Sequence, residues 1–395
     1  MLTIESVDQV LKSYYLDAIC TQLNSGISPF YSAIEKTAAL ISGKDAIVPV
    51  ELGISGGLGT TEEAGELPVS AAALRECLTV PLRNIYGVID VSDKLLRANR
   101  DNASGLVNVL NTEIQMMIRS AQFNLNRMMW GNGDGLLGVI AERTEQTANP
   151  HEFKVEDARK LTAGMCIDIM RNNTPVYSNV RITDVDYIND IFTIEVISVA
   201  GHEDAAAGDK IYMQKSKGHE VNGVPYLFYN LSSDYYGLPK LYAPGIEPCV
   251  KDLNAELSLE AMQEFFDGIS MRSAIPTNMI VCSLKTRRQY LNQLMLTRTN
   301  IDYLNLDGGF KTLAFNGVPV CGERFVEDGS MYYLNTDAFK LVQLCDWEWL
   351  QGDNGSILNQ IDRKAVYTAT LVKYANLVST YPRAQGVMQG ITDPA

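Results

Sequence analysis

The sequence predicts an α+β protein with more than one domain. Apolar residues at three- and four-residue spacing predict one long helix over residues 104–130, and short or alternating apolar runs predict strands on both sides of it. The helices and strands follow no regular alternation, which favours α+β over a parallel α/β sheet. A chain of 395 residues is long enough for two or three domains.

The N-terminal part, before the long helix, predicts an arm and an extended loop. Residues 1–42 start with apolar side chains on one helical face, so we expect a short helix that leads into an irregular arm. Short β-type runs at 46–50 and 78–82 flank residues 53–68, which hold five glycines and three glutamates. That stretch has too little apolar surface to form a core, and loops of this length are uncommon unless they are functional. We therefore expect a two-stranded excursion that reaches away from the body.

The long helix carries a continuous apolar stripe. At 1.5 Å per residue the helix is roughly 40 Å long, and the glycine-rich residues 131–133 end it. The methionines in the stripe are suited to filling irregular gaps in a core. The expected core face of this helix consists of Leu110, Ile114, Met117, Ala121 and Leu125.

The rest of the chain predicts a β-rich insertion followed by mixed structure. Residues 148–222 are β-patterned, with a hairpin turn at Asn189-Asp190, and predict a small β-barrel or sandwich inserted in the chain. Residues 250–300 return to helix around a buried strand. Residues 310–350 predict strands again, with Asn316-Gly317 as a strong hairpin signal, and residues 366–374 predict a closing strand.

Charge, cysteines and hydropathy exclude several classes of protein. The net charge of −14 argues against a surface that binds nucleic acid by neutralising its phosphates. The seven cysteines are scattered singly and the three histidines lie in turn-rich segments, so we expect neither a zinc site nor a redox pair. No apolar run approaches the roughly 18 residues that cross a bilayer, and the first residues lack the pattern of a secretion signal.

Three patterns suggest a site, but none of them assembles one. Residues 133–138 match a dinucleotide fingerprint, yet a helix precedes them and a β region follows, so helix termination explains the glycines. Glu62, Glu63 and Glu66 lack the burial that tunes a carboxylate, and an acidic tip facing water or a partner is favoured. The alternating tryptophans in residues 346–349 are typical of packing or an interface. We expect no catalytic residue, cofactor or metal.

Seven segments of the chain carry a resemblance to a known family: residues 61–68, 80–86, 91–96, 130–133, 135–138, 315–320 and 331–335. Together with the order of arm, loop, long helix, mixed domain and closing strands, they resemble major capsid proteins of tailed bacteriophages with the Hong Kong 97-type fold. In that family's terms the chain divides into an N-arm (1–45), an E-loop (46–92), a P-domain with the spine helix (93–147), an inserted β-rich domain (148–222), an A-domain (223–345) and closing strands with a C-terminal tail (346–395).

The resemblance implies a viral structural protein rather than an enzyme. Such proteins self-assemble as hexamers and pentamers into an icosahedral shell around double-stranded DNA, in the host cytoplasm, and remain in the virion. The implied partners are further copies of the chain, a separate scaffolding protein, the portal, a decoration protein and DNA bound without sequence specificity; no cofactor and no membrane are implied. The loop tip is implied to contact neighbouring subunits through Thr61, Glu62, Glu63, Glu66, Leu67 and Pro68.

Two departures from the family and two alternative functions remain. Some members join the loop to a neighbour by a lysine–asparagine bond, but residues 46–93 contain no lysine, so we do not expect that cross-link. The loop begins within about fifty residues of Met1, so a long cleaved scaffold segment is not expected either. The alternatives are an encapsulin-like shell of a cellular nanocompartment, which shares the fold but encloses an enzyme, and an unrelated α+β enzyme.

Overall fold

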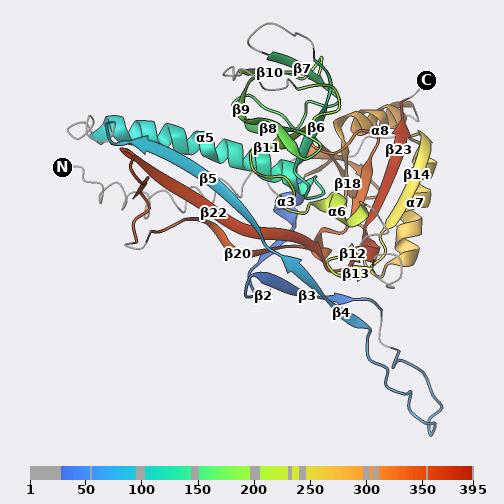
Figure 1. The fold of residues 1–395 in the computed structure, drawn as a ribbon. Coiled ribbons are helices and arrows are strands. Elements are labelled where there is room, and N and C mark those ends of the chain that lie inside the picture. The colour runs from blue at the N-terminus through green and yellow to red at the C-terminus, as the bar shows by residue number, and fades with distance from the viewer. Residues whose placement is uncertain are drawn as a thin grey trace. The chain divides into compact units, whose positions relative to one another are not determined.

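The structure is a computed structural model and divides the chain into two compact units (Figure 1). The larger unit comprises Met1–Asn126 and Leu227–Ala395, and the smaller comprises Arg127–Tyr226. The helix expected near the N-terminus lies outside the described residues. These are 28–53, 56–94, 103–143, 151–195, 205–229, 234–239, 246–296, 303–305, 311–352 and 355–393.

The larger unit begins with a short helix and a hairpin. Ser28 caps the helix α3 (Pro29–Ala33), because its hydroxyl oxygen accepts a hydrogen bond from the Tyr31 N–H at 3.1 Å. The strands β2, β3 and β4 then form an antiparallel sheet, in which β3 and β4 pair from Asp45↔Pro81 to Glu51↔Arg75. The strands up to this point are β1 (Glu35–Thr37), β2 (Ile41–Ser42), β3 (Asp45–Glu51) and β4 (Arg75–Pro81).

The helix α5 (Ala103–Met129) lies along a sheet built from strands at both ends of the chain (Figure 1). The strand β22 pairs with β5 on one side, and with β20 and β21 on the other, while β1 adds to β20 in parallel. The Trp347 and Trp349 side chains of β20 are buried. The further strands of this sheet are β5 (Arg83–Ser92), β20 (Phe339–Trp349), β21 (Asn359–Gln360) and β22 (Val366–Ser379).

A seven-stranded mixed sheet forms the second core of the larger unit. Its order is β14-β23-β19-β15-β18-β17-β16, and the apolar faces of α7 (Leu259–Arg272) and α8 (Leu284–Leu296) pack on it through Phe265, Ile269 and Tyr290. Its strands are β14 (Cys249–Glu256), β15 (Met279–Ser283), β16 (Tyr303–Asn305), β17 (Lys311–Phe315), β18 (Val318–Glu323), β19 (Met331–Leu334) and β23 (Gly386–Thr392). The remaining elements are α6 (Val224–Phe228), the hairpin β12 (Asp234–Tyr235) and β13 (Leu238–Pro239), and the 3-10 turns η2 (Thr336–Ala338) and η3 (Pro382–Ala384).

The smaller unit is a closed barrel of six strands in the order β10-β7-β6-β11-β8-β9. Phe153, Phe192 and Ile182 are among the side chains that fill it, and all three are fully buried. The unit begins at Arg127, earlier than the predicted boundary at 148, because β6 pairs with both β7 and β11 and so belongs to the barrel. Its strands are β6 (Leu136–Arg143), β7 (His151–Val155), β8 (Cys166–Arg171), β9 (Thr174–Asp186), β10 (Ile191–Glu195) and β11 (Lys210–Met213).

In the part of the chain that the structure describes, no helix is both long enough and apolar enough to cross a membrane.

Candidate assembly surfaces

The loop between β3 and β4 exposes apolar side chains. Leu58, Leu67 and Val69 are 95%, 85% and 86% exposed, and no residue described between 56 and 74 is buried. Monomeric proteins rarely leave apolar surface of this kind together in water, and such patches mark interaction sites. The loop is therefore a candidate interaction surface.

The acidic tip of this loop is a local turn with all its predicted contact residues exposed. The N–H of Gly65 donates a hydrogen bond to the carbonyl oxygen of Glu62 at 2.9 Å, and the Thr61 hydroxyl donates to the same carbonyl at 2.8 Å. The residues proposed from the sequence as contacts, Thr61, Glu62, Glu63, Glu66, Leu67 and Pro68, are all exposed.

A second apolar surface lies on β5. Ile89 and Val91 are buried, whereas Tyr86 and Val88, on the other side of the strand, are more than half exposed. The ring of Tyr86 meets that of Tyr374 edge to face, with centroids 6.3 Å apart. One face of the sheet thus carries the core, while the opposite face presents aromatic and aliphatic side chains where a solvated face is usually polar.

The predicted core face of the long helix is buried to different degrees along its length. Ile114 and Leu125 are buried, Met117 and Ala121 are half-buried, and the side chain of Leu110 lies outside those described. Ile118, which the sequence analysis did not single out, is buried as well. It follows Ile114 by one helical turn, so the same spacing that selected the other residues also predicts it.

A buried polar cluster joins β1, β20 and β22. The ammonium group of Lys373, which is fully buried, donates to Oε1 of Gln343 at 2.8 Å and to Oδ1 of Asp346 at 2.6 Å. Nearby, the Lys36 ammonium lies 4.3 Å from the centroid of the Tyr31 ring. Burial, and then repulsion by Lys373, lowers the pKa of Lys36, and the attraction of Asp346 opposes them. The cluster therefore sets two lysines around one carboxylate.

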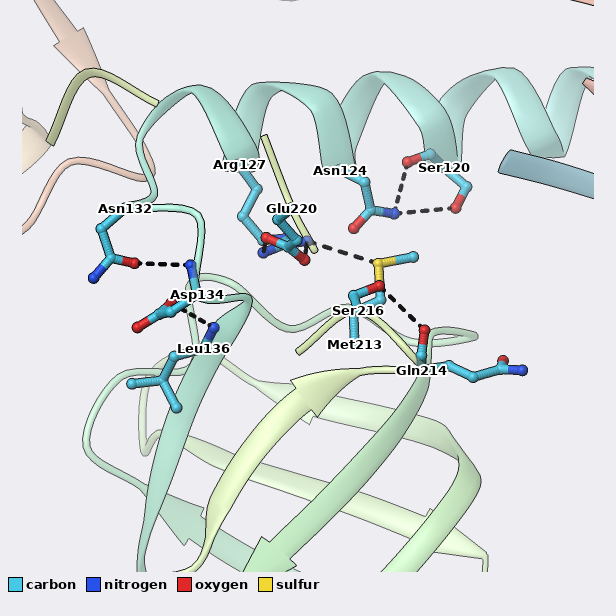
Figure 2. Close-up of polar contacts among 10 residues, drawn as sticks. All are labelled: Ser120, Asn124, Arg127, Asn132, Asp134, Leu136, Met213, Gln214, Ser216 and Glu220. Carbon is cyan, nitrogen blue, oxygen red and sulfur yellow. Dashed lines mark hydrogen bonds and ion pairs between the residues drawn. The ribbon is translucent and has the colours of Figure 1, made fainter. Parts of the chain in front are cut away.

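The glycine-rich run 133–138 feeds a strand. The N–H of Asp134 donates to Oδ1 of Asn132 at 3.2 Å, and the N–H of Leu136 donates to Oδ1 of Asp134 at 2.8 Å (Figure 2). Gly133 and Gly135 adopt φ of 85° and 79°, which side chains other than glycine rarely do. The run is a turn between α5 and β6, and it opens no helix whose N-terminus a pyrophosphate would occupy.

Within the smaller unit, a buried ion pair joins the segments that enter and leave the barrel. The Arg127 guanidinium donates to both carboxylate oxygens of Glu220, at 2.9 and 2.6 Å (Figure 2). Both side chains are almost fully buried. The N–H of Gly223 also donates to the carbonyl oxygen of Gly131 at 3.0 Å. The two-point geometry of this pair is among the strongest that charged side chains form.

No three His, Cys, Asp or Glu side chains among the described residues are grouped so that they could hold a metal ion. The described cysteines are free thiols, and burial raises the pKa of Cys282 to about 12 and that of Cys321 to about 11. A thiol with a raised pKa is a poor nucleophile because little of it is thiolate.

Comparison with known proteins finds likeness only in structure: no family model and no curated protein matches this chain. The cyanophage A-1(L) capsid asymmetric unit is similar with 11% identity and a TM-score of 0.56, over 98% of this chain and 96% of the other. The capsid of an empty GTA particle shares 11% identity (TM-score 0.48, 93% and 91%). The SrpI encapsulin complex of Synechococcus elongatus PCC 7942 shares 10% (TM-score 0.47, 93% and 89%).

The likeness to the cyanophage capsid extends over nearly all of both chains. At 11% sequence identity this likeness is evidence for a shared fold alone. It confirms the fold class predicted from the sequence: this chain has the α+β fold of Hong Kong 97-type phage capsid proteins.

Proposed function

We propose that the chain is the major capsid protein of a tailed bacteriophage, a subunit that self-assembles as hexamers and pentamers into an icosahedral shell around double-stranded DNA. The observation that carries the proposal is the likeness in fold to the cyanophage capsid over almost the full length of both chains. The exposed apolar loop and the apolar face of β5 support it, because a shell subunit needs surfaces that only its neighbours cover.

In this proposal the segments take the roles that the sequence predicted, except that the inserted domain starts at residue 127. The helix α5 is the spine helix, and β3, β4 and their connection form the E-loop. The remaining assignments are the N-arm (1–45), the A-domain (223–345) and the closing strands with the C-terminal tail (346–395).

The E-loop lies across a neighbouring subunit in the proposed shell. Full burial of a Leu or Val side chain contributes about 1.5–3 kcal/mol, so Leu58, Leu67 and Val69 together supply a large part of one contact. The polar tip, from Thr61 to Pro68, sits at the edge of that contact. Because every subunit of a capsomer repeats the contact, the shell is held by many non-covalent contacts.

The proposed partners follow from the shell. They are further copies of the chain, a separate scaffolding protein, the portal and a decoration protein. DNA is enclosed without sequence-specific binding, and the net charge of −14 suits a wall that does not trap it. The proposed location is the virion, after assembly in the host cytoplasm.

Electron microscopy of the purified chain, expressed with a scaffolding protein, tests the proposal. The wild-type chain is expected to form closed shells of uniform size. A variant with Leu58→Ser, Leu67→Ser and Val69→Ser is expected to stay soluble and folded, by circular dichroism, but to form no shells. Ile188→Ser is the matched control, since Ile188 is equally exposed but lies in the barrel unit, and it is expected to assemble.

Four outcomes contradict parts of this proposal. A wild-type chain that remains monomeric with the scaffold present removes the shell itself, and a monomer that turns over a substrate supports an unrelated enzyme. Normal shells from the triple variant remove the role of the loop. Shells that enclose a protein cargo, with no nuclease-protected DNA, support an encapsulin-like compartment.

A further inference from the structure

One polar pair links the C-terminal part of α5 to the end of β18 within the larger unit. Nδ2 of Asn126 donates a hydrogen bond to Oε1 of Glu323 at 3.2 Å, and the backbone N–H of Arg324 donates to the same oxygen at 2.8 Å. Glu323 is only 7% exposed. Oδ1 of Asn126 is buried too, and no donor reaches it among the described atoms. A buried amide oxygen without a hydrogen-bond donor is energetically disfavoured. One further donor hydrogen would therefore stabilise this pair.

A cluster of two aromatic rings and one guanidinium joins the same two segments. Phe123 of α5 and Phe325, just after β18, meet edge to face with their centroids 5.1 Å apart. The Arg324 guanidinium lies over both rings, 5.3 Å from the centroid of Phe123 and 5.5 Å from that of Phe325. The Glu323 side chain itself is only 7% exposed, and exclusion of water disfavours the charged form of a carboxyl group.

The charged and titratable groups near Glu323 lower its pKa by less than burial raises it. Burial raises the pKa of Glu323, against hydrogen bonds from the Arg324 and Phe325 N–H groups and Asn126 and against the charge of Arg324. The thiol of Cys321 lies on the same strand, and Glu323 helps to raise its pKa, while Arg287 of α8 acts in the opposite direction on that thiol. The pKa of Glu323 is therefore held above that of an exposed glutamate.

We propose that Asn126 and Glu323 form a proton-operated latch between α5 and β18, closed when the Glu323 carboxyl group is neutral. A neutral carboxyl group has one donor and one acceptor, which match the acceptor and the donor of the asparagine amide. Its O–H supplies the hydrogen that Oδ1 of Asn126 lacks. After ionisation the group only accepts, so Oδ1 loses its donor and a charge is left in a buried position.

The sign of the pH effect follows from the raised pKa. The folded chain holds the Glu323 proton more tightly than the unfolded chain, whose glutamates titrate near about pH 4.3. The latch therefore contributes its full stability below that pH and loses it as the pH rises through the folded-state pKa. This inference concerns the subunit alone and does not depend on the proposed shell function.

The variant Glu323→Gln tests the latch, because glutamine keeps one donor and one acceptor but does not ionise. Urea unfolding of the full-length chain is measured from about pH 5 to about pH 8 at one protein concentration. The midpoint of the wild type is expected to fall with pH relative to that of Glu323→Gln. Glu327→Gln is the matched control, since Glu327 is exposed, and it is expected to follow the wild type.

Two measurements can overturn the proposal. Parallel midpoint curves for the wild type and Glu323→Gln would show that Glu323 does not change its protonation with the fold. Infrared spectroscopy is the second, because the wild type in mildly acidic buffer, where exposed glutamates are already ionised, is expected to show the C=O band of a neutral carboxyl group that Glu323→Gln lacks. Absence of that band difference in both acidic and neutral buffer would show that the carboxyl group stays ionised.

Discussion

At the scale of single residues, Gly87 shows how closely β5 and α5 approach each other. A Cβ atom added at Gly87 would lie 2.9 Å from Sδ of Met117 and 3.3 Å from its Cγ. Both distances are shorter than ordinary van der Waals contact, so the two elements pack around a missing side chain. The half-buried Met117 fills that space from the helix side, as the flexibility of methionine allows.

We expect Gly87→Ala to lower the free energy of unfolding by about 1–3 kcal/mol, the usual cost of overfilling a packed core. Urea unfolding measures this effect. Gly268→Ala is the control, because no atom lies within 4 Å of the added Cβ there and Gly268 is inside α7. That substitution is expected to raise the free energy of unfolding by about 0.5–1 kcal/mol. Equal effects of both substitutions would contradict the close packing of Gly87.

The partners of the buried charged residues were beyond prediction from the sequence. Lys373 stands in an apolar run that predicts a strand, which indicates burial, but its partner Asp346 lies 27 residues away on another strand. Asn126 and Glu323 are separated by 197 residues. Local patterns report on near neighbours, whereas such pairs depend on how distant strands are placed. The exposed Glu62, Glu63 and Glu66, which make no such pair, followed from local composition alone.

At the scale of elements, local signals predicted helices and turns well. The spacing of apolar residues predicted a helix over 104–130, and α5 spans Ala103–Met129. Asn316-Gly317 connects β17 to β18, with φ of 50° and 77°, the positive values that a tight hairpin turn requires. The predicted insertion did not include the strand β6. Its place in the barrel depends on pairing with β11, which is the last barrel strand in the sequence, so local patterns around β6 do not reveal it.

The buried ion pair of Arg127 and Glu220 joins the segments that enter and leave the barrel, so we expect it to contribute to the stability of the smaller unit. We expect Glu220→Ala to lower the free energy of unfolding of this unit by about 3–5 kcal/mol, because it leaves a buried guanidinium without its carboxylate. Hydrogen exchange of the β6 and β11 amides measures this unit separately. Lys285→Ala is the control, since its ion pair with Asp393 is largely exposed and contributes only about 0–1 kcal/mol. Unchanged exchange in Glu220→Ala would contradict the role of the pair.

At the scale of the whole molecule, the order of the segments was the strongest signal in the sequence. A polar loop between two strands, a long helix and closing strands each match many proteins, but their succession matches few. The strands β5 and β22 come from opposite ends of the chain and pair over ten residues, from Arg83↔Ala375 to Ser92↔Val366. The sheet under α5 therefore needs two strands that lie far apart in the sequence, and no single segment indicates that pairing.

In the proposed shell the loop acts in assembly rather than in folding, and deletion of residues 54–66 separates the two. None of the side chains described between 56 and 74 is buried, and shortening a flexible loop changes its closure entropy by less than about 1 kcal/mol. We therefore expect the deleted chain to unfold within about 1 kcal/mol of the wild type, measured in urea, but to form no shells in electron micrographs. A glycine–serine segment of equal length in place of 54–66 keeps the reach of the loop without its side chains. It is also expected to fail in assembly, because the contact needs those side chains. Shells from that replacement, but not from the deletion, would show that only the length of the loop matters, and shells from both would remove its role between subunits.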